Sequence, residues 1–396
     1  MHKLCLSMIV KNESHIILEC LNSVYKEIDY WVIVDTGSTD GTQEIITNFF
    51  KEKNIPGELH EKPWVSFGHN RTEALELCRG KTEFAFMIDA DDFLVGSLKF
   101  KAEPDVDGYI LRLGREEFSW WRSQIFRVDS GWRYVGVLHE YAACDKPNPV
   151  LKRLEGEYRV VARTMGARNL NITPIEKYSK DAEVLEKALE TEPGNVRYQF
   201  YLAQSYFDSR QFEKAEEAYA KRVEMEGWQE EVYYSKYRMG VCKAMLNKPW
   251  GEVLEAFLDA FNYRPIRAEP LFHIAQVYRM KMKKPALAYM FAKMAAEVPY
   301  PSQDILFVPD IIYKFGILDE VASTAYYAGQ PIIGHAACMK ILKENRVSEA
   351  ELERVQKNLK QYEDIIEKMK LEAHKIHQHE NPPKQEQKKK TYKSRK

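Results

Sequence analysis

Short apolar segments alternate with amphipathic segments from the first residue to about residue 112. Continuous apolar runs predict buried strands at residues 4–10, 31–34 and 84–88, and a third, shorter strand is expected at residues 58–62. Apolar residues at helical spacing lie between these runs and predict helices at residues 17–28, 45–50 and 72–78. Strand–helix alternation of this kind is typical of a mostly parallel sheet covered by helices.

The pattern becomes more β-like from about residue 108 to residue 165. Alternating and apolar runs predict further strands at residues 109–113, 123–127, 132–139 and 158–161. We expect these strands to extend the same sheet in mixed orientation. The first domain is therefore predicted to be an α/β domain over residues 1–170.

After Pro174 nearly every segment has the spacing of a helix. The pairs Leu202-Ala203, Met239-Gly240 and Ile274-Ala275 recur at separations of 37 and 35 residues, close to the ~34 residues of tetratricopeptide repeats. We expect an all-α, tetratricopeptide-like domain over residues 171–345. A long charged helix over residues 346–380 and a disordered basic tail over residues 381–396 are predicted to follow.

Composition narrows the class of protein. The 396 residues are 45% hydrophobic, and their net charge of −1 makes nucleic acid an improbable partner. The six cysteines stand singly, which favours reduced thiols over disulfides or a zinc site. No segment has the pattern of a signal peptide or a transmembrane helix. We therefore expect a soluble, cytoplasmic protein of two or three domains.

The most informative polar cluster is Asp89-Ala90-Asp91-Asp92, which directly follows the apolar run at residues 84–88. Three neighbouring carboxylates repel one another unless a positive charge lies among them. A hard divalent cation, Mn or Mg, binds such oxygen ligands. The alternative is a polar turn in which an aspartate caps the next element.

Other polar segments also follow predicted strands. Lys11-Asn12-Glu13 follows the first strand, and Asp35 follows the second, with Gly37 and Ser38 in a tight turn. Ligands of open α/β sheets bind at this edge. The Asp35 carboxylate can accept a hydrogen bond from the imide N–H of uracil, whereas Asp40 better fits a helix cap.

Two segments further along carry candidate chemistry. Asn70 and Arg71 are expected just before a helix, where a guanidinium can meet a base carbonyl or a phosphate. His139-Glu140 is expected at the end of a strand, where a metal-binding imidazole would lie beside a general base. Exposed structural roles are the alternative for both segments.

Taken in order, these motifs resemble the family 2 glycosyltransferases of GT-A fold, in the subgroup with a C-terminal tetratricopeptide-like region. The resemblance covers about residues 3–345 and implies a nucleotide-sugar donor, most often a UDP-sugar. It implies that Asp89 and Asp91 are the DxD pair that holds Mn or Mg, with His139 as a possible metal or diphosphate contact. Glu140 would be the catalytic base. The implied donor contacts are Lys11, Asn12, Glu13, Asp35, Gly37, Ser38, Asn70, Arg71, Asp89 and Ala90.

One departure affects the third metal ligand. Members of this subgroup often carry a histidine near residues 160–166, where this chain has Arg163. Arg163 or Arg168 would then meet the diphosphate instead.

The resemblance predicts a metal-dependent transfer with inversion, by single displacement, to a glycan or protein acceptor. The helical repeats would bind a protein partner or form a homodimer. Two alternatives remain open at this point: a non-catalytic repeat scaffold with a degenerate GT-A domain, and a sugar nucleotidyltransferase, which also uses paired aspartates.

Overall fold

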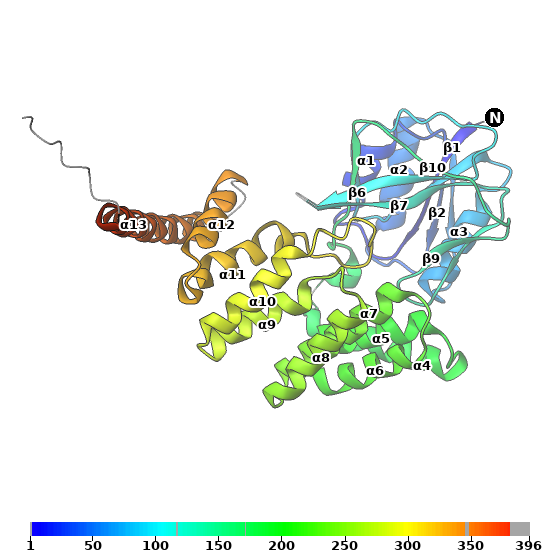
Figure 1. Cartoon of the computed structure of the whole chain (residues 1–396). Helices are drawn as coiled ribbons and strands as arrows, with labels where there is room; N and C mark the ends of the chain where they lie inside the picture. The colour runs from blue at the N-terminus through cyan, green and yellow to red at the C-terminus, as the bar shows by residue number, and fades with distance from the viewer. Residues whose placement is uncertain (1, 116–117, 171, 345–347, 381–396) are drawn as a thin grey trace, which may run out of the picture. The chain divides into compact units, whose positions relative to one another are not determined.

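The computed structural model describes residues 2–115, 118–170, 172–344 and 348–380 (Figure 1). The predicted tail over residues 381–396 lies outside these ranges. The chain divides into two compact units, Met1–Ala218 and Tyr219–Lys396. No helix among the described residues combines the length and the apolarity needed to cross a membrane.

A nine-stranded sheet forms the centre of the first unit, with strand order β3-β2-β1-β4-β7-β6-β11-β5 and β10 beside β6. Its parallel half contains β1 (His2–Val10), β2 (Tyr30–Asp35), β3 (Gly57–Glu61) and β4 (Thr82–Met87). The mixed half contains β5 (Phe93–Gly96), β6 (Gly108–Arg115), β7 (Phe118–Arg127), β10 (Leu151–Arg153) and β11 (Tyr158–Val161).

Helices and a small ribbon cover the two faces of the sheet. Successive side chains of β1 point to opposite faces, so Leu4, Leu6 and Met8 pack with helices α1 (Ile17–Val24) and α2 (Thr42–Lys53). Cys5 packs on the other face with α3 (Phe67–Leu77) and the ribbon of β8 (Trp132–Val135) and β9 (Tyr141–Cys144). Burial on both faces explains why β1 is apolar from Leu4 to Val10 except at Ser7.

The parallel register determines where the polar motifs lie. Val10 of β1 pairs with Asp35 of β2, and Ser7 of β1 pairs with Met87 of β4. The three strands therefore end at one edge of the sheet, as expected for a ligand-binding edge of an open α/β sheet. Residues 11–13, 35–38 and 89–92 leave the sheet at this edge.

Two predicted boundaries are wrong. The strand expected over residues 132–139 ends at Val135, because the backbone turns at Gly136 (φ +118°) and again at His139 (φ +51°). His139 and Glu140 therefore lie in a turn and not at the end of a strand. Arg71 lies inside α3 and not before it, because the Ser66 hydroxyl caps this helix by accepting from the His69 N–H (3.2 Å).

The first unit continues with helices α4 (Pro174–Thr191) and α5 (Val196–Asp208) and the start of α6 (Phe212–Glu224). Helix α4 begins with a capping box, in which the side chains and backbone of Thr173 and Glu176 bond reciprocally. Helices α4 and α5 pack against each other.

The second unit is helical. It contains α7 (Gln229–Met245), α8 (Trp250–Tyr263), α9 (Glu269–Gln276), α10 (Pro285–Glu297), α11 (Ile317–Thr324), α12 (Pro331–Glu344) and the long helix α13 (Glu349–Glu380). Successive helices pack in pairs, and the recurring small residue lies at the contact. A Cβ added at Gly240 of α7 would come within 2.7 Å of the Phe257 ring of α8. The predicted fold class, a mostly parallel α/β domain followed by tetratricopeptide-like helices, is confirmed.

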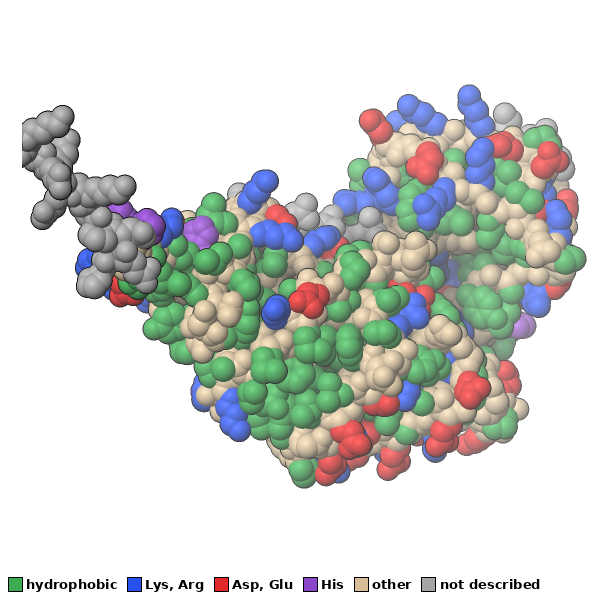
Figure 2. All heavy atoms as spheres, viewed as in Figure 1, with side chains coloured by type: hydrophobic (Ala, Val, Ile, Leu, Met, Phe, Trp, Pro, Cys, Tyr) green, Lys and Arg blue, Asp and Glu red, His purple; other side chains and the backbone are tan. Residues whose placement is uncertain are grey.

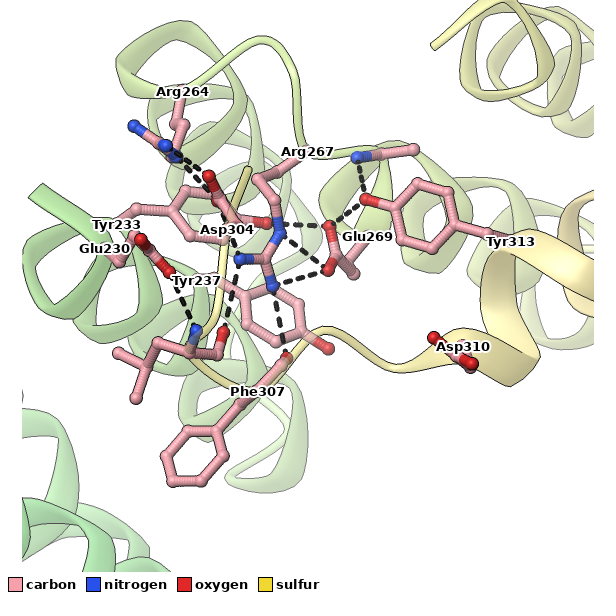
Figure 3. Close-up of polar contacts among 12 residues, drawn as sticks. Glu230, Tyr233, Tyr237, Arg264, Arg267, Glu269, Asp304, Phe307, Asp310 and Tyr313 are labelled. Atoms are coloured by element: carbon pink, nitrogen blue, oxygen red, sulfur yellow. Dashed lines mark hydrogen bonds and ion pairs between the residues drawn. The ribbon is translucent and has the colours of Figure 1, made fainter. Parts of the chain in front are cut away.

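A buried ionic cluster holds the loop before α11 against α7, α8 and α9 (Figure 3). The Arg267 side chain, 1% exposed, pairs with Glu269 at 2.7 Å and with Asp304 at 3.1 Å. Its remaining N–H groups donate to the carbonyls of Leu306 and Phe307 (3.3 and 3.1 Å). Every strong donor of this guanidinium is used inside the unit, so the cluster has a structural role.

Replacing Arg267 with Met should lower the free energy of unfolding by about 3–5 kcal/mol, because Glu269 would stay buried without its cation and Asp304 would keep only Arg264. The exposed pair Lys236–Asp259 (2.6 Å) is the matched control, and Lys236→Met should cost less than about 1 kcal/mol. Urea unfolding of both variants measures the difference, and equal costs would contradict the assignment.

His273 should make the second unit sensitive to acid. Burial lowers its pKa from 6.5 to about 4, and its ring is hydrogen-bonded to the Tyr237 hydroxyl at 2.7 Å. The unfolded chain takes up a proton below about pH 6.5 and the folded chain does not. Stability is therefore complete above this pH and falls by up to about 3 kcal/mol as the pH falls to 4. Between pH 7 and pH 4, urea titrations should show a larger loss of stability in the wild type than in His273→Phe, by up to about 3 kcal/mol.

Candidate active site

A cavity of about 580 Å³ opens at the carboxyl edge of the parallel strands. Its lining combines acidic and basic side chains with a few aromatic ones. The charged lining residues are Glu13, Arg71, Asp89, Asp91, Arg122, Glu140, Arg163, Arg168 and Arg197.

The Arg71 guanidinium lies between two carboxylates of this cavity. It donates a hydrogen bond to Asp89, and its Nε lies 2.9 Å from Glu140 Oε1. Burial alone would lower the pKa of Arg71, but the charges of Asp89 and Glu140 raise it well above its ordinary value. Arg71 therefore stays charged and links the predicted DxD motif to the predicted base.

The other two aspartates of the cluster hold the chain segment that follows β11. Asp91 Oδ2 accepts from the N–H groups of Met165 and Gly166, both at 2.9 Å. Asp92 is buried, accepts from the Arg163 N–H at 2.9 Å, and has a pKa raised to about 8, by burial first and then by the charge of Asp89. Asp92 thus faces this segment and not the cavity.

Glu13 joins the same segment from β1. Its carboxylate accepts from the Ala167 N–H at 3.1 Å, and burial raises its pKa to about 7. A Cβ added at Gly166 would come within 3.2 Å of Glu13 and 3.3 Å of Asp91. Three successive backbone N–H groups, at residues 165–167, therefore bring two carboxylates close together.

Asp35 closes the turn after β2. Its Oδ1 accepts from the N–H groups of Gly37 and Ser38, both at 2.8 Å. Its Oδ2 is buried and has no hydrogen-bond partner among the described residues. Ser38 in turn accepts from the Asn12 N–H at 2.9 Å, so the loops after β1 and β2 hold each other. A buried carboxylate oxygen without a partner is suited to a ligand or a water molecule.

A second cavity of about 590 Å³ shares Ile9, Glu13, Phe67, Leu138 and Arg168 with the first. It is lined by the loops after β1 and β2, by the start of α3 and by α4. Its further lining residues include Lys11, Asn12, Thr36, Trp64, Lys180 and Val184. Trp64 is 43% exposed and packs edge-on against Phe67. The two cavities form neighbouring compartments along one edge of the sheet.

The structure does not bring every predicted residue to these compartments. The Asn70 side chain is fully buried and bonds to the Val65 N–H (2.9 Å) and the Pro63 carbonyl (3.0 Å). It therefore holds the loop before α3 and does not point toward a ligand. Arg163 and Arg168, predicted as alternative diphosphate contacts, do line the first cavity, where they are paired with Glu19 and Asp181.

The predicted metal set of Asp89, Asp91 and His139 is not assembled. Within residues 2–115, 118–170, 172–344 and 348–380, no three His, Cys, Asp or Glu side chains gather as a metal site. The His139 ring instead stacks on Tyr201 of α5, with centroids 3.9 Å apart. Its left-handed backbone turns the ring toward this helix.

Sequence reasoning missed several lining residues. Arg122 of β7 carries a positive charge that lowers the pKa of Asp89, although less than Arg71 does. Arg197 and Tyr201 come from α5, inside the region read as helical repeat. No motif in the sequence marks these residues. Trp120 also lines the cavity, whereas Trp132 lies in the core.

A family model matches the N-terminal part of the chain. Residues 5–98 match the family model described as "Glycosyl transferase family 2". The SPbeta prophage-derived glycosyltransferase SunS of Bacillus subtilis (strain 168) is 29% identical over 145 residues, 34% of this chain and 33% of SunS. An uncharacterized glycosyltransferase of Rickettsia prowazekii (strain Madrid E) is 31% identical over 103 residues, 26% of this chain and 32% of the relative. The chain thus spans about a third of the length of these curated relatives.

Among solved structures, S. aureus TarS 1-349 in complex with UDP-GlcNAc is similar with a TM-score of 0.36 and 15% identity. The match covers 62% of this chain and 87% of that one.

Gly68 of α3 should tolerate no side chain. A Cβ there would lie 2.5 Å from the Gly136 carbonyl oxygen, so Gly68→Ala must displace the loop that carries Glu140. We expect a loss of about 1–3 kcal/mol in unfolding free energy. Gly251→Ala in α8 is the control, because nothing lies within 4 Å of that position and alanine favours a helix by up to about 1 kcal/mol. If Gly68→Ala and Gly251→Ala changed the stability equally in thermal or urea unfolding, α3 would not approach the Gly136 carbonyl closely.

Proposed function

We propose that this chain, whose N-terminal region is a glycosyltransferase family 2 domain, transfers a sugar from a nucleotide-sugar donor to an acceptor. One observation carries the proposal. The domain that matches the family model ends its parallel strands at a cavity where Asp89, Asp91, Arg71 and Glu140 meet. The aspartates could hold a cation beside a diphosphate leaving group, and Glu140 could take the proton of an attacking hydroxyl.

The two compartments fit the two halves of such a donor. The nucleoside would occupy the cavity beside Trp64, where an exposed aromatic face can stack on a base. Asp35 directly precedes Thr36, which lines this cavity, and its partnerless Oδ2 supports a base with an N–H donor, which favours uracil and hence a UDP-sugar. The sugar and diphosphate would occupy the cavity that contains Asp89 and Asp91, near the positive charge of Arg122.

Asp89 and Asp91 fit a divalent cation, Mn or Mg, as a pair of ligands. Mg is commonly held by one or two carboxylates together with substrate phosphates, without a full protein cage. Two aspartates at the cavity therefore suffice if the donor supplies the remaining oxygens. Once bound there, the cation would stabilise the negative charge that develops on the leaving diphosphate.

Glu140 is proposed as the base of a single displacement. The acceptor oxygen attacks the anomeric carbon from the side opposite the diphosphate, and the Glu140 carboxylate takes the acceptor proton. The bond between the sugar and the diphosphate breaks, and the nucleoside diphosphate leaves with the bonding electrons. The configuration at the anomeric carbon is inverted. The Arg71 ion pair orients Glu140 for this step, because it fixes the carboxylate at the cavity wall.

The helices beyond the site are proposed to bind the acceptor or a protein partner. Exposed hydrophobic side chains gather over helices α8 to α10 on the face in view in Figure 2. Leu258, Met280, Met290 and Met294 are among the exposed side chains of this region. Helical repeats commonly present such surfaces to extended ligands.

A donor panel tests the proposal. Purified protein with Mn or Mg should release a nucleoside diphosphate from one nucleotide sugar, and EDTA should abolish the release. Asp91→Asn should lower kcat by about 100-fold or more, because charge stabilisation at the leaving group is lost. Asp129→Asn, at an exposed position, is the control and should leave kcat unchanged.

Three outcomes would contradict parts of the proposal. Full activity of Asp91→Asn would remove the cation assignment. Formation of diphosphate from a sugar phosphate and a nucleoside triphosphate would indicate a nucleotidyltransferase. Absence of turnover with every donor, in a protein that binds UDP, would indicate a non-catalytic domain.

A further inference from the structure

Side chains of helix α5 contact the loop that carries Glu140, the proposed base. The Arg197 guanidinium donates two hydrogen bonds to one acceptor, the His139 carbonyl, through Nη2 (2.8 Å) and Nε (3.2 Å). The Tyr198 hydroxyl accepts from the Val137 N–H at 3.3 Å. The Tyr201 ring lies parallel to the His139 ring, 9° from coplanar. Three residues of one helix thus hold two backbone groups and one side chain of the loop before Glu140.

The loop needs this support because its backbone is unfavourable on its own. His139 has φ +51°, a left-handed conformation that costs energy for a residue with a side chain. On the side away from α5, the loop is contacted by helix α3. There, α3 packs against it at Gly68, and Thr72 accepts from the Tyr134 N–H at 2.9 Å.

The direction of Glu140 depends on this turn. The Glu140 carboxylate reaches Arg71 of α3 while the His139 ring turns to α5, so adjacent side chains point to different helices. The Glu140 side chain is only 10% exposed. A relaxed His139 would swing the carboxylate away from the cavity.

We propose that Arg197 and Tyr201 are positioning residues for sugar transfer, which clamp the turn at His139 and thereby hold Glu140 at the cavity. The inference rests on the proposed function. It makes the first helix pair of the repeat region, α4 and α5, a working part of the catalytic unit. It also assigns His139 a role as the clamped residue in place of a metal ligand.

The contacts distinguish this role from substrate binding. Arg197 lines the cavity, but the hydrogen bonds of two of its nitrogens go to the protein backbone, and its guanidinium also lies over the rings of Tyr141 and Tyr201 at 5.0 and 4.9 Å. A side chain held in this way supports the wall of the cavity. Its loss should change the orientation of Glu140 more than the affinity for the donor.

The test compares full-length Arg197→Met and Tyr201→Leu with the wild type. Each variant should lower kcat by about 10- to 100-fold, the effect of a small misplacement of a reacting group. The KM of the donor should change less than about threefold, since uniform binding is retained. Arg197→Lys should recover part of kcat, because one donor and the charge remain.

The matched control is Arg153→Met. Arg153 is exposed, and its guanidinium lies 5.0 Å from the Trp121 ring, outside the cavity lining. This variant removes a comparable arginine–aromatic contact from the same unit and should keep kcat and KM.

Hydrogen exchange gives a readout that does not need activity. Amides of residues 137–140 should exchange up to about tenfold faster in Arg197→Met, the effect of losing about one hydrogen bond. They should be unchanged in Arg153→Met. If Arg197→Met does not fold, Tyr201→Leu serves in its place for both measurements.

The outcomes separate the two proposals. Unchanged exchange at residues 137–140, or unchanged kcat with faster exchange, overturns the positioning role. A loss confined to the KM of the donor also overturns it, because Arg197 would then bind substrate. No transfer by the wild type with any donor overturns the proposed function, while the exchange experiment still decides whether α5 clamps the turn.

Discussion

The ion pairs of Arg71 are the interaction on which the arrangement of the site depends. Three aspartates follow one strand, and a glutamate approaches from another part of the chain, so the cavity gathers negative charge. Arg71 lies between Asp89 and Glu140 and compensates both. A buried cation of this kind stabilises only because its partners surround it, and its removal would leave uncompensated carboxylates.

The pairing of Arg71 with Asp89 changes how the charge of the acidic cluster at residues 89–92 is balanced. The repulsion among its carboxylates was expected to require a metal ion, but an arginine already meets part of that requirement. The remaining carboxylate charge is distributed by the backbone, because the N–H groups of residues 165–167 hold Asp91 and Glu13. The cluster is thus stable in the absence of a ligand and still presents Asp89 and Asp91 to the cavity.

The sequence was sufficient for the sheet and its ligand-binding edge. Apolar runs identified β1, β2 and β4, and polar residues directly after them identified the edge, since parallel strands end together. It was not sufficient for Asn70, because nothing in its neighbourhood distinguishes an amide that braces a loop from one that meets a ligand. It also failed at His139, where a left-handed turn at a residue other than glycine leaves no pattern.

The residues contributed by α5 show a more general limit. The helical pattern of residues 196–208 predicts which positions face neighbouring helices, and it assigns Arg197 to a partly exposed surface. That surface faces the turn at His139 only because the chain folds α4 and α5 back into the first unit. Contacts between distant segments of this kind depend on tertiary packing, so a repeat pattern cannot distinguish a helix that only builds a solenoid from one that completes a site.

Under the proposed function, the donor and the cation would bind together. Asp89 and Asp91 offer too few oxygens to complete the coordination of Mg or Mn, which takes about six ligands in octahedral geometry. Asp89 is also shared with Arg71. A cation alone would therefore compete with the guanidinium for one of its two ligands, whereas a diphosphate brings further oxygens and a charge that Arg71 and Arg122 can share. The same arginine that pairs with Asp89 would thus disfavour a cation without a donor, and this would link binding of the proposed metal to binding of the proposed donor.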